Sequence, residues 1–201
     1  MFSKGSKNRL TSHDLDRFAG GTLFDRVARA VCQAGCLPRK ELYEAWETAR
    51  RTRRLFRGGR VVDLAGGHGL LAYVMLLLDG TSEAAVVVDP AVPASAAHLR
   101  DAMTTEWPRL RDRIAYRVSA LDAIALTRSD VVVSCHACGA LTDRVLDLAI
   151  AARARVSVLP CCHDAQTCDS GPLAGWLDRP SAIDVMRAMR LEREGYRVWT
   201  Q

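Results

Sequence analysis

The sequence lacks any apolar run long enough to cross a lipid bilayer. Its densest apolar stretch, residues 70–78, reads LLAYVMLLL, whereas a membrane-spanning helix needs about 20 apolar residues. The first eighteen residues are polar and contain no apolar core of a secretory signal. We therefore expect a cytoplasmic protein with no membrane partner.

Lysine is also scarce, because almost all of the 28 basic residues are arginines. The formal net charge is +5. Arginine binds phosphate with two parallel hydrogen bonds and stacks on bases, so a nucleic-acid partner is permitted by the composition but is not required by it.

Without an export signal, a disulfide framework is not expected for the seven cysteines. An odd number of cysteines in a chain of this size favours reduced thiols, metal ligands or core residues. The content of 49% hydrophobic and 25% charged residues is typical of a globular protein with one full-sized core.

The first third of the chain has helical periodicity. Apolar residues recur at helix spacing from Leu23 to the stop at Gly35, and a second amphipathic pattern opens at Pro38. We expect residues 1–57 to form an N-terminal helical cap. The second helix ends in a cluster of arginines that is either a solvated helix end or a phosphate-facing patch: Arg50, Arg51, Arg53, Arg54 and Arg57.

From residue 58 to 201, short β-branched runs alternate with helical ones. Helices are expected after the strands, with Thr142 capping one and Ser181 and Asp184 forming a variant capping box on another. Continuous apolar strands alternating with helices predict an α/β fold, a doubly wound, Rossmann-like parallel sheet covered on both faces. Strands are expected at 60–64, 84–89, 113–119, 130–134, 156–160 and 196–201.

In such a sheet the ligand lies beyond the carboxyl ends of the strands. The first strand leads into Asp63-Leu64-Ala65-Gly66-Gly67-His68-Gly69. This stretch resembles motif I of class I S-adenosylmethionine-dependent methyltransferases, in which glycines let the backbone approach the cofactor. The resemblance implies that Asp63 holds the amino group of S-adenosylmethionine, that Ala65, Gly66, Gly67 and Gly69 line it, and that Asp89 accepts the ribose hydroxyls.

Three more residues complete the expected cofactor set. The end of the third strand should reach the adenine, and there Leu121 and Asp122 are the candidates, although Asp122 could equally be a helix N-cap. Ser134 ends the fourth strand. The glycines also fit a dinucleotide fingerprint, Gly67-x-Gly69-x-x-Ala72, so an NAD-dependent oxidoreductase is the first alternative.

Two further segments carry the most distinctive resemblance. His136, Cys138 and Gly139 are followed by Thr142-Asp143, and Cys161-Cys162-His163 follows the fifth strand. These segments resemble the methyltransferase domain of acceptor-stem tRNA ribose 2′-O-methyltransferases over roughly residues 58–170. The resemblance implies methyl transfer to an oxygen or nitrogen nucleophile. RNA, including tRNA, is the leading acceptor class, and a small molecule is the other option.

Three roles compete for His136, Cys138, Cys161, Cys162 and His163. They could bind a metal, which would suit a noncatalytic metal-binding module, but the spacing lacks two C-x₂-C pairs and adjacent cysteines are expected to point apart. A nucleophilic cysteine is the second role. We favour the third, in which the thiols line the methyl-transfer pocket and one histidine is the base. No metal is assigned on this basis, and Cys135 and the remaining cysteines are expected in the core or at the surface.

A class I methyltransferase sheet normally contains a seventh, antiparallel strand beside the fifth. The sequence ends with the expected sixth strand, so the seventh is missing and we expect a truncated sheet.

Overall fold

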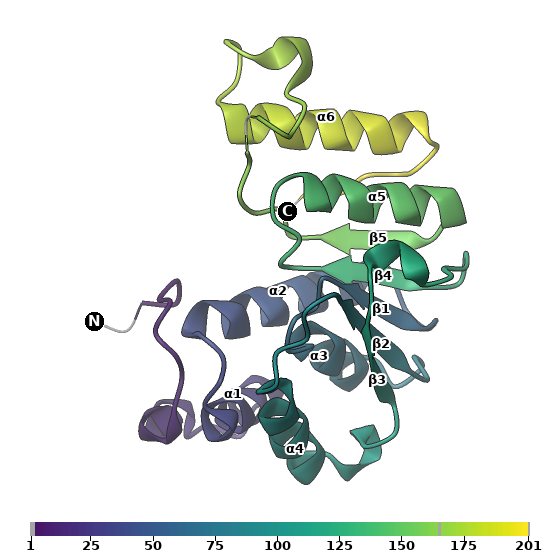
Figure 1. Ribbon diagram of the computed structural model, residues 1–201. Coiled ribbons are helices and arrows are strands. Elements are labelled where there is room, and N and C mark those ends of the chain that lie inside the picture. Colours follow the sequence, from purple (N-terminus) through teal and green to yellow (C-terminus); the bar gives the residue numbers. More distant parts are fainter. Residues whose placement is uncertain (1–2, 165, 201) are drawn as a thin grey trace.

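The computed structural model describes residues 3–164 and 166–200. It contains a parallel sheet of five strands in the order β3-β2-β1-β4-β5 with helices on both faces (Figure 1). All four strand pairs are parallel, which confirms the predicted doubly wound α/β fold. The strands are β1 (Val61–Leu64), β2 (Ala85–Asp89), β3 (Ile114–Val118), β4 (Val131–Ser134) and β5 (Arg155–Val158).

Helices follow the strands as expected. The α-helices are α1 (Leu23–Ala34), α2 (Arg39–Leu55), α3 (Leu70–Leu78), α4 (Ala96–Glu106), α5 (Ala140–Ala152) and α6 (Arg179–Arg193). The 3₁₀ helices are η1 (Ser12–Phe18), η2 (Pro108–Leu110), η3 (Leu121–Ala123) and η4 (Gly171–Leu173). No helix in the described part of the chain is long and apolar enough to cross a membrane.

Alternate residues of each strand enter different cores, because successive side chains of a strand point to opposite faces. Val61 and Val131 pack with α1 to α4 on one face. Their chain neighbours Val62 and Val132 pack with α5 and η3 on the other. The N-terminal helices belong to the first core, since α1 contacts α4 and α2 contacts α3 (Figure 1). They therefore share apolar packing with the sheet.

The two predicted helix caps were wrong. α5 begins after Gly139, which has a left-handed φ of 56°, and the buried Thr142 lies one turn inside, where its hydroxyl donates to the carbonyl of Ala137. α6 is capped by Asp178, which accepts a hydrogen bond from the Ser181 amide at 3.1 Å. Both helices begin earlier than expected because their caps lie outside the apolar pattern on which the prediction depended.

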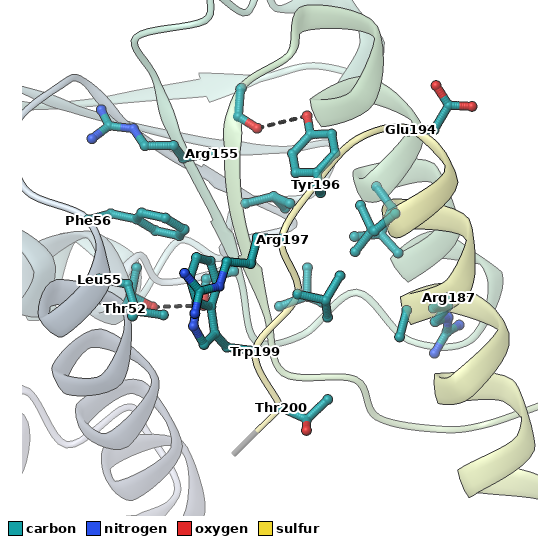
Figure 2. Close-up of a pocket in the computed structure, with 18 of the residues that line it drawn as sticks. Thr52, Leu55, Phe56, Arg155, Arg187, Glu194, Tyr196, Arg197, Trp199 and Thr200 are labelled. Atoms are coloured by element: carbon teal, nitrogen blue, oxygen red, sulfur yellow. Dashed lines mark hydrogen bonds between the residues drawn. The ribbon is translucent and has the colours of Figure 1, made fainter.

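The predicted sixth strand was also wrong for residues 196–200, which pair with no strand. Aromatic side chains anchor this segment instead. The Tyr196 hydroxyl contacts the carbonyl oxygens of Ala149 and Ala154, both at 2.9 Å, and Trp199 meets Phe56 edge-on. The segment, β5, α6 and the end of α2 enclose a cavity of about 570 Å³ along the outer edge of β5 (Figure 2).

Candidate active site

A small pocket lies where the carboxyl ends of β1 and β4 meet the amino-terminal part of α2. Asp63 of β1 lines it with Gly66 and His68 of the turn that follows, and Cys135 and His136 line it directly after β4. Glu41 lines the same pocket from α2. Of the strand ends, those of β1 and β4 meet at this pocket, and α2 and α3 supply further lining residues.

The glycine turn has a backbone conformation and a close packing that leave little room for a Cβ atom. Gly67 and Gly69 have φ angles of 51° and 79°. A Cβ atom on Gly66 would lie 2.7 Å from the Asp63 carboxyl carbon, and one on Gly69 would lie 2.8 Å from Val87. Ala65 has φ 55°, so this non-glycine residue accepts the left-handed conformation at a cost of about 1–2 kcal/mol.

Asp63 is the most unusual group of the pocket. Its side chain is 1% exposed, Oδ2 accepts only the Ala72 amide at 3.3 Å, and Oδ1 has no hydrogen-bond partner among the described residues. Burial raises the pKa of Asp63 to about 7, although the Ala72 amide opposes this rise. A buried carboxylate oxygen without a donor fits the ammonium group of S-adenosylmethionine.

Asp89 connects β2 to the glycine turn. Its Oδ2 accepts the Gly67 amide at 3.0 Å and its Oδ1 accepts the Ala91 amide at 2.8 Å. These bonds fix the plane of the carboxylate. Each oxygen keeps a lone pair for a further donor, so the group fits a ribose diol.

The three further candidates for cofactor binding are placed differently from one another. Leu121 is buried in the second core, and Ser134 is 1% exposed with a hydroxyl oxygen that has no partner among the described residues. Asp122 forms an exposed ion pair with Arg144 at 2.9 Å and lies inside η3, not at its N-cap, which is Ala120. The alternative N-cap role of Asp122 was therefore wrong.

The two histidines of the motifs point to different surroundings. His136 is half-buried and lines the pocket with Asp63. His163 forms a hydrogen bond from Nε2 to Asp184 of α6 at 2.8 Å. Of the two motif histidines, His136 is therefore the one that lines the pocket with Asp63.

Glu41 was missed by sequence reasoning. Burial raises the pKa of the Glu41 carboxyl, and the proximity of His136 lowers it in part. Local sequence carries no signal for this pair, because Glu41 occupies an ordinary position in an amphipathic helix and its neighbour lies far along the chain.

The cysteines divide into two groups. Cys135 is buried and its thiol donates to the Thr48 hydroxyl at 3.3 Å, which confirms its expected core position. Cys138, Cys161 and Cys162 form a cluster whose Sγ atoms all lie within 4.8 Å of one another. Adjacent cysteines were expected to point apart, and this was wrong because Cys162 has a left-handed φ of 53°.

The segment after β4 is held by an arginine of α6. Arg187 donates to the Gly139 carbonyl at 3.0 Å and to both carboxylate oxygens of Asp143 at 2.8 and 2.9 Å. Arg187 is 6% exposed and also pairs with Asp184 at 3.1 Å. The Thr142-Asp143 pair therefore shapes the loop that carries Cys138.

The arginine cluster of α2 is not a single patch. Arg53 is 2% exposed and pairs with the buried Asp79 at 3.1 Å, which links α2 to the end of α3. Arg50 and Arg51 both pair with Glu47, at 3.0 and 3.4 Å. Neither a solvated helix end nor a phosphate-facing patch describes the whole cluster, because Arg53 at its centre is buried.

Comparisons with known proteins identify the family of this chain. A family model described as a methyltransferase domain matches residues 41–167, which include the pocket, Glu41 and the cysteine cluster. A comparison with curated proteins finds no match.

Solved structures with similar folds include the mitomycin 7-O-methyltransferase MmcR, at 18% identity and a TM-score of 0.48 over 94% of this chain and 58% of that one. The pyocyanin biosynthetic protein PhzM has 17% identity and a TM-score of 0.49 over 81% and 52%. The Trypanosoma brucei PRMT1 enzyme-prozyme complex with AdoHcy has 20% identity and a TM-score of 0.40 over 56% and 34%.

This chain therefore spans less than two thirds of the length of each of these structures. Since the TM-scores are below 0.5, the assignment depends on the family match and on the observed topology. The chain belongs to the methyltransferase-domain family and has a Rossmann-like, doubly wound parallel sheet.

Proposed function

We propose that this protein transfers the methyl group of S-adenosylmethionine to an oxygen or nitrogen atom of an RNA. The observation that carries the proposal is the buried Asp63 oxygen without a donor, in the same pocket as His136. S-adenosylmethionine, when bound, supplies an already activated methyl group, so the protein has to bind, orient and exclude water.

In this proposal the cofactor is held along the carboxyl edge of the sheet. Asp63 binds the ammonium group, the backbone of Ala65, Gly66, Gly67 and Gly69 packs against the cofactor, and Asp89 accepts the ribose hydroxyls. Leu121, Asp122 and Ser134 would lie at the adenine side, with Asp122 exchanging its Arg144 ion pair for an adenine contact.

His136 is proposed as the residue that orients the acceptor and takes its proton, because it lines the pocket that contains Asp63. His163 is already engaged by Asp184, which supports a positioning role for it. Cys138, Cys161 and Cys162 form the neighbouring wall. Burial and the adjacent thiols raise the pKa of Cys161 to about 12, which argues against a thiolate nucleophile there.

RNA is proposed as the acceptor class because of the net charge of +5 and the motif resemblance. The structure reduces the contribution expected from α2, since Arg53 is buried, but Arg54 and Arg57 are exposed. A small-molecule acceptor is the alternative outcome of the test. The NAD alternative is disfavoured by Asp63, because a buried carboxyl at the glycine turn offers nothing to an anionic pyrophosphate.

The test is transfer of labelled methyl groups from S-adenosylmethionine to total RNA and, separately, to a small-molecule extract. We expect label in RNA, and about 100-fold slower transfer by His136→Ala with unchanged cofactor affinity. Label only in small molecules would overturn the acceptor class, and an unchanged rate in His136→Ala would remove the histidine from the mechanism. His98→Ala, at a different helix, is the matched control.

A further inference from the structure

Three thiols from two loops converge beside the candidate active site. Cys138 follows β4, and Cys161 and Cys162 follow β5. The Sγ atoms of Cys138 and Cys161 are 3.2 Å apart, and all three lie within 4.8 Å of one another. Within residues 3–164 and 166–200, no other trio of histidine, cysteine or acidic side chains meets this spacing.

The backbone brings the two adjacent cysteines to the same side. Cys162 adopts a left-handed φ of 53°, a conformation that is strained for a residue with a side chain. The Asp164 amide donates to the Cys162 carbonyl at 2.7 Å, and the Gly139 amide donates to the Cys161 carbonyl at 3.2 Å. The second of these bonds joins the two loops, so the backbone supports the approach of the thiols.

We propose that Cys138, Cys161 and Cys162 bind one thiophilic divalent cation, with Zn²⁺ as the ion to test. Zinc–thiolate bonds of about 2.3 Å in a tetrahedron separate neighbouring sulfurs by about 3.8 Å. The observed separations, from 3.2 Å to within 4.8 Å, bracket that distance. Binding breaks three S–H bonds, forms three Zn–S bonds and releases three protons, with water in the fourth position and no electron transfer.

Access and charge both suit such an ion. Cys138 and Cys162 are exposed, so an ion can enter from solvent and the two side chains can adjust. Three thiolates around one Zn²⁺ carry a net charge of −1. Lys40 of α2 pairs with Glu44 at 3.3 Å and also interacts electrostatically with Cys161 and Cys162, so its ammonium group would offset that charge.

The full chain is first reduced and stripped of metal with a chelator. It is then titrated with Zn²⁺ in the presence of a chromophoric chelator that competes for the ion. We expect one equivalent to bind. Cys138→Ser, Cys161→Ser and Cys162→Ser should each weaken binding by more than about 100-fold, because losing even an outer contact of a metal site costs about 10- to 100-fold. Cys36→Ser, a buried cysteine outside the cluster, should bind like the parent.

Cobalt(II) gives a second readout, since thiolate ligands produce an intense charge-transfer absorption that oxygen ligands do not. Absence of a stoichiometric site, or binding that survives all three substitutions, would overturn the proposal. The proposal would also be overturned if the reduced protein took up no Zn²⁺ and, on exposure to air, formed a disulfide between Cys138 and Cys161. None of these measurements uses the methyl donor, so their outcome is independent of the proposed methyl transfer.

Discussion

At the scale of single residues, Asp63 and the glycines beside it line the pocket that we propose for the cofactor. Asp63 is expected to be partly protonated near neutral pH in the free protein, because its pKa is raised to about 7. The ammonium group of the cofactor would favour the charged form. Stability and cofactor binding are therefore linked through one carboxyl group.

The sign of this linkage gives a prediction for Asp63→Asn. A folded pKa of about 7, above the ordinary 3.8, means that the folded state holds the proton more tightly, so the contribution to stability is lost as pH rises from about 4 through 7. We expect the parent to lose a few kcal/mol relative to Asp63→Asn between about pH 5 and about pH 8. Urea unfolding of both proteins measures this difference, and a pH-independent difference would contradict the shifted pKa.

The glycine turn offers a matched pair of substitutions. Gly69→Ala meets Val87 and the Tyr116 hydroxyl at 2.8 and 2.9 Å, whereas Gly67→Ala meets nothing within 4 Å, and both positions have positive φ. We expect Gly67→Ala to cost about 1 kcal/mol from backbone strain alone and Gly69→Ala about 2–4 kcal/mol, since overpacking is added. Thermal unfolding measures both, and equal costs would show that close packing at Gly69 is not the constraint.

At the scale of elements, one buried ion pair joins α2 to the end of α3. Arg53 of α2 donates to the Met75 carbonyl at 3.1 Å and the Ser82 hydroxyl at 2.8 Å, and it pairs with Asp79. Burial opposes ionisation of Asp79, but hydrogen bonds from Thr81 and Gly58 and the charge of Arg53 lower its pKa to about 2. The polar atoms of both side chains have partners, so removing the Arg53 side chain leaves the charge of Asp79 buried without its counter-ion.

We therefore expect Arg53→Ala to destabilise the protein by about 3–5 kcal/mol. Arg50→Ala, which breaks an exposed ion pair with Glu47 on the same helix, should cost less than about 1 kcal/mol. Chemical denaturation of the two variants compares them directly. Similar small effects would mean that α2 is not tied to α3 through Arg53.

The elements themselves were largely predictable from sequence, and the reasons are physical. Periodicity located α1, α2 and the five parallel strands, because burial of one or both faces leaves a repeating apolar pattern. Caps outside that pattern, at Gly139 and Asp178, were missed. The expected strand at 196–201 failed in its described part because the aromatic side chains of Tyr196 and Trp199 contact α5 and Phe56, and the backbone pairs with no strand.

The site was predictable only where the chain places its parts at strand ends. Asp63, Asp89 and His136 follow strands, so the topology of a parallel sheet brings them together. The role of Glu41, the separation of His163 from the pocket and the convergence of Cys161 with Cys162 depend on tertiary contacts and on one left-handed residue. No local pattern encodes these features.

At the scale of the whole molecule, charge and acceptor class are connected. If RNA is the acceptor, phosphate contacts release counterions, so affinity should fall about 10- to 1000-fold between about 50 and 200 mM salt. Substituting the exposed Arg54 and Arg57 together should reduce that slope, whereas Arg26→Ala, on α1, serves as the control. Filter binding at several salt concentrations measures the slope, and a flat response would remove RNA phosphate from the proposal.

The most direct test of the central claim is a calorimetric titration of the purified protein with S-adenosylmethionine, in parallel with Asp89→Ala. We expect the parent to bind S-adenosylmethionine one-to-one with micromolar affinity. Asp89→Ala should bind at least about tenfold more weakly, since it loses two ribose hydrogen bonds to a charged group. Absence of binding by the parent, or equal affinity of parent and variant, would contradict the cofactor site assigned to Asp63 through Asp89.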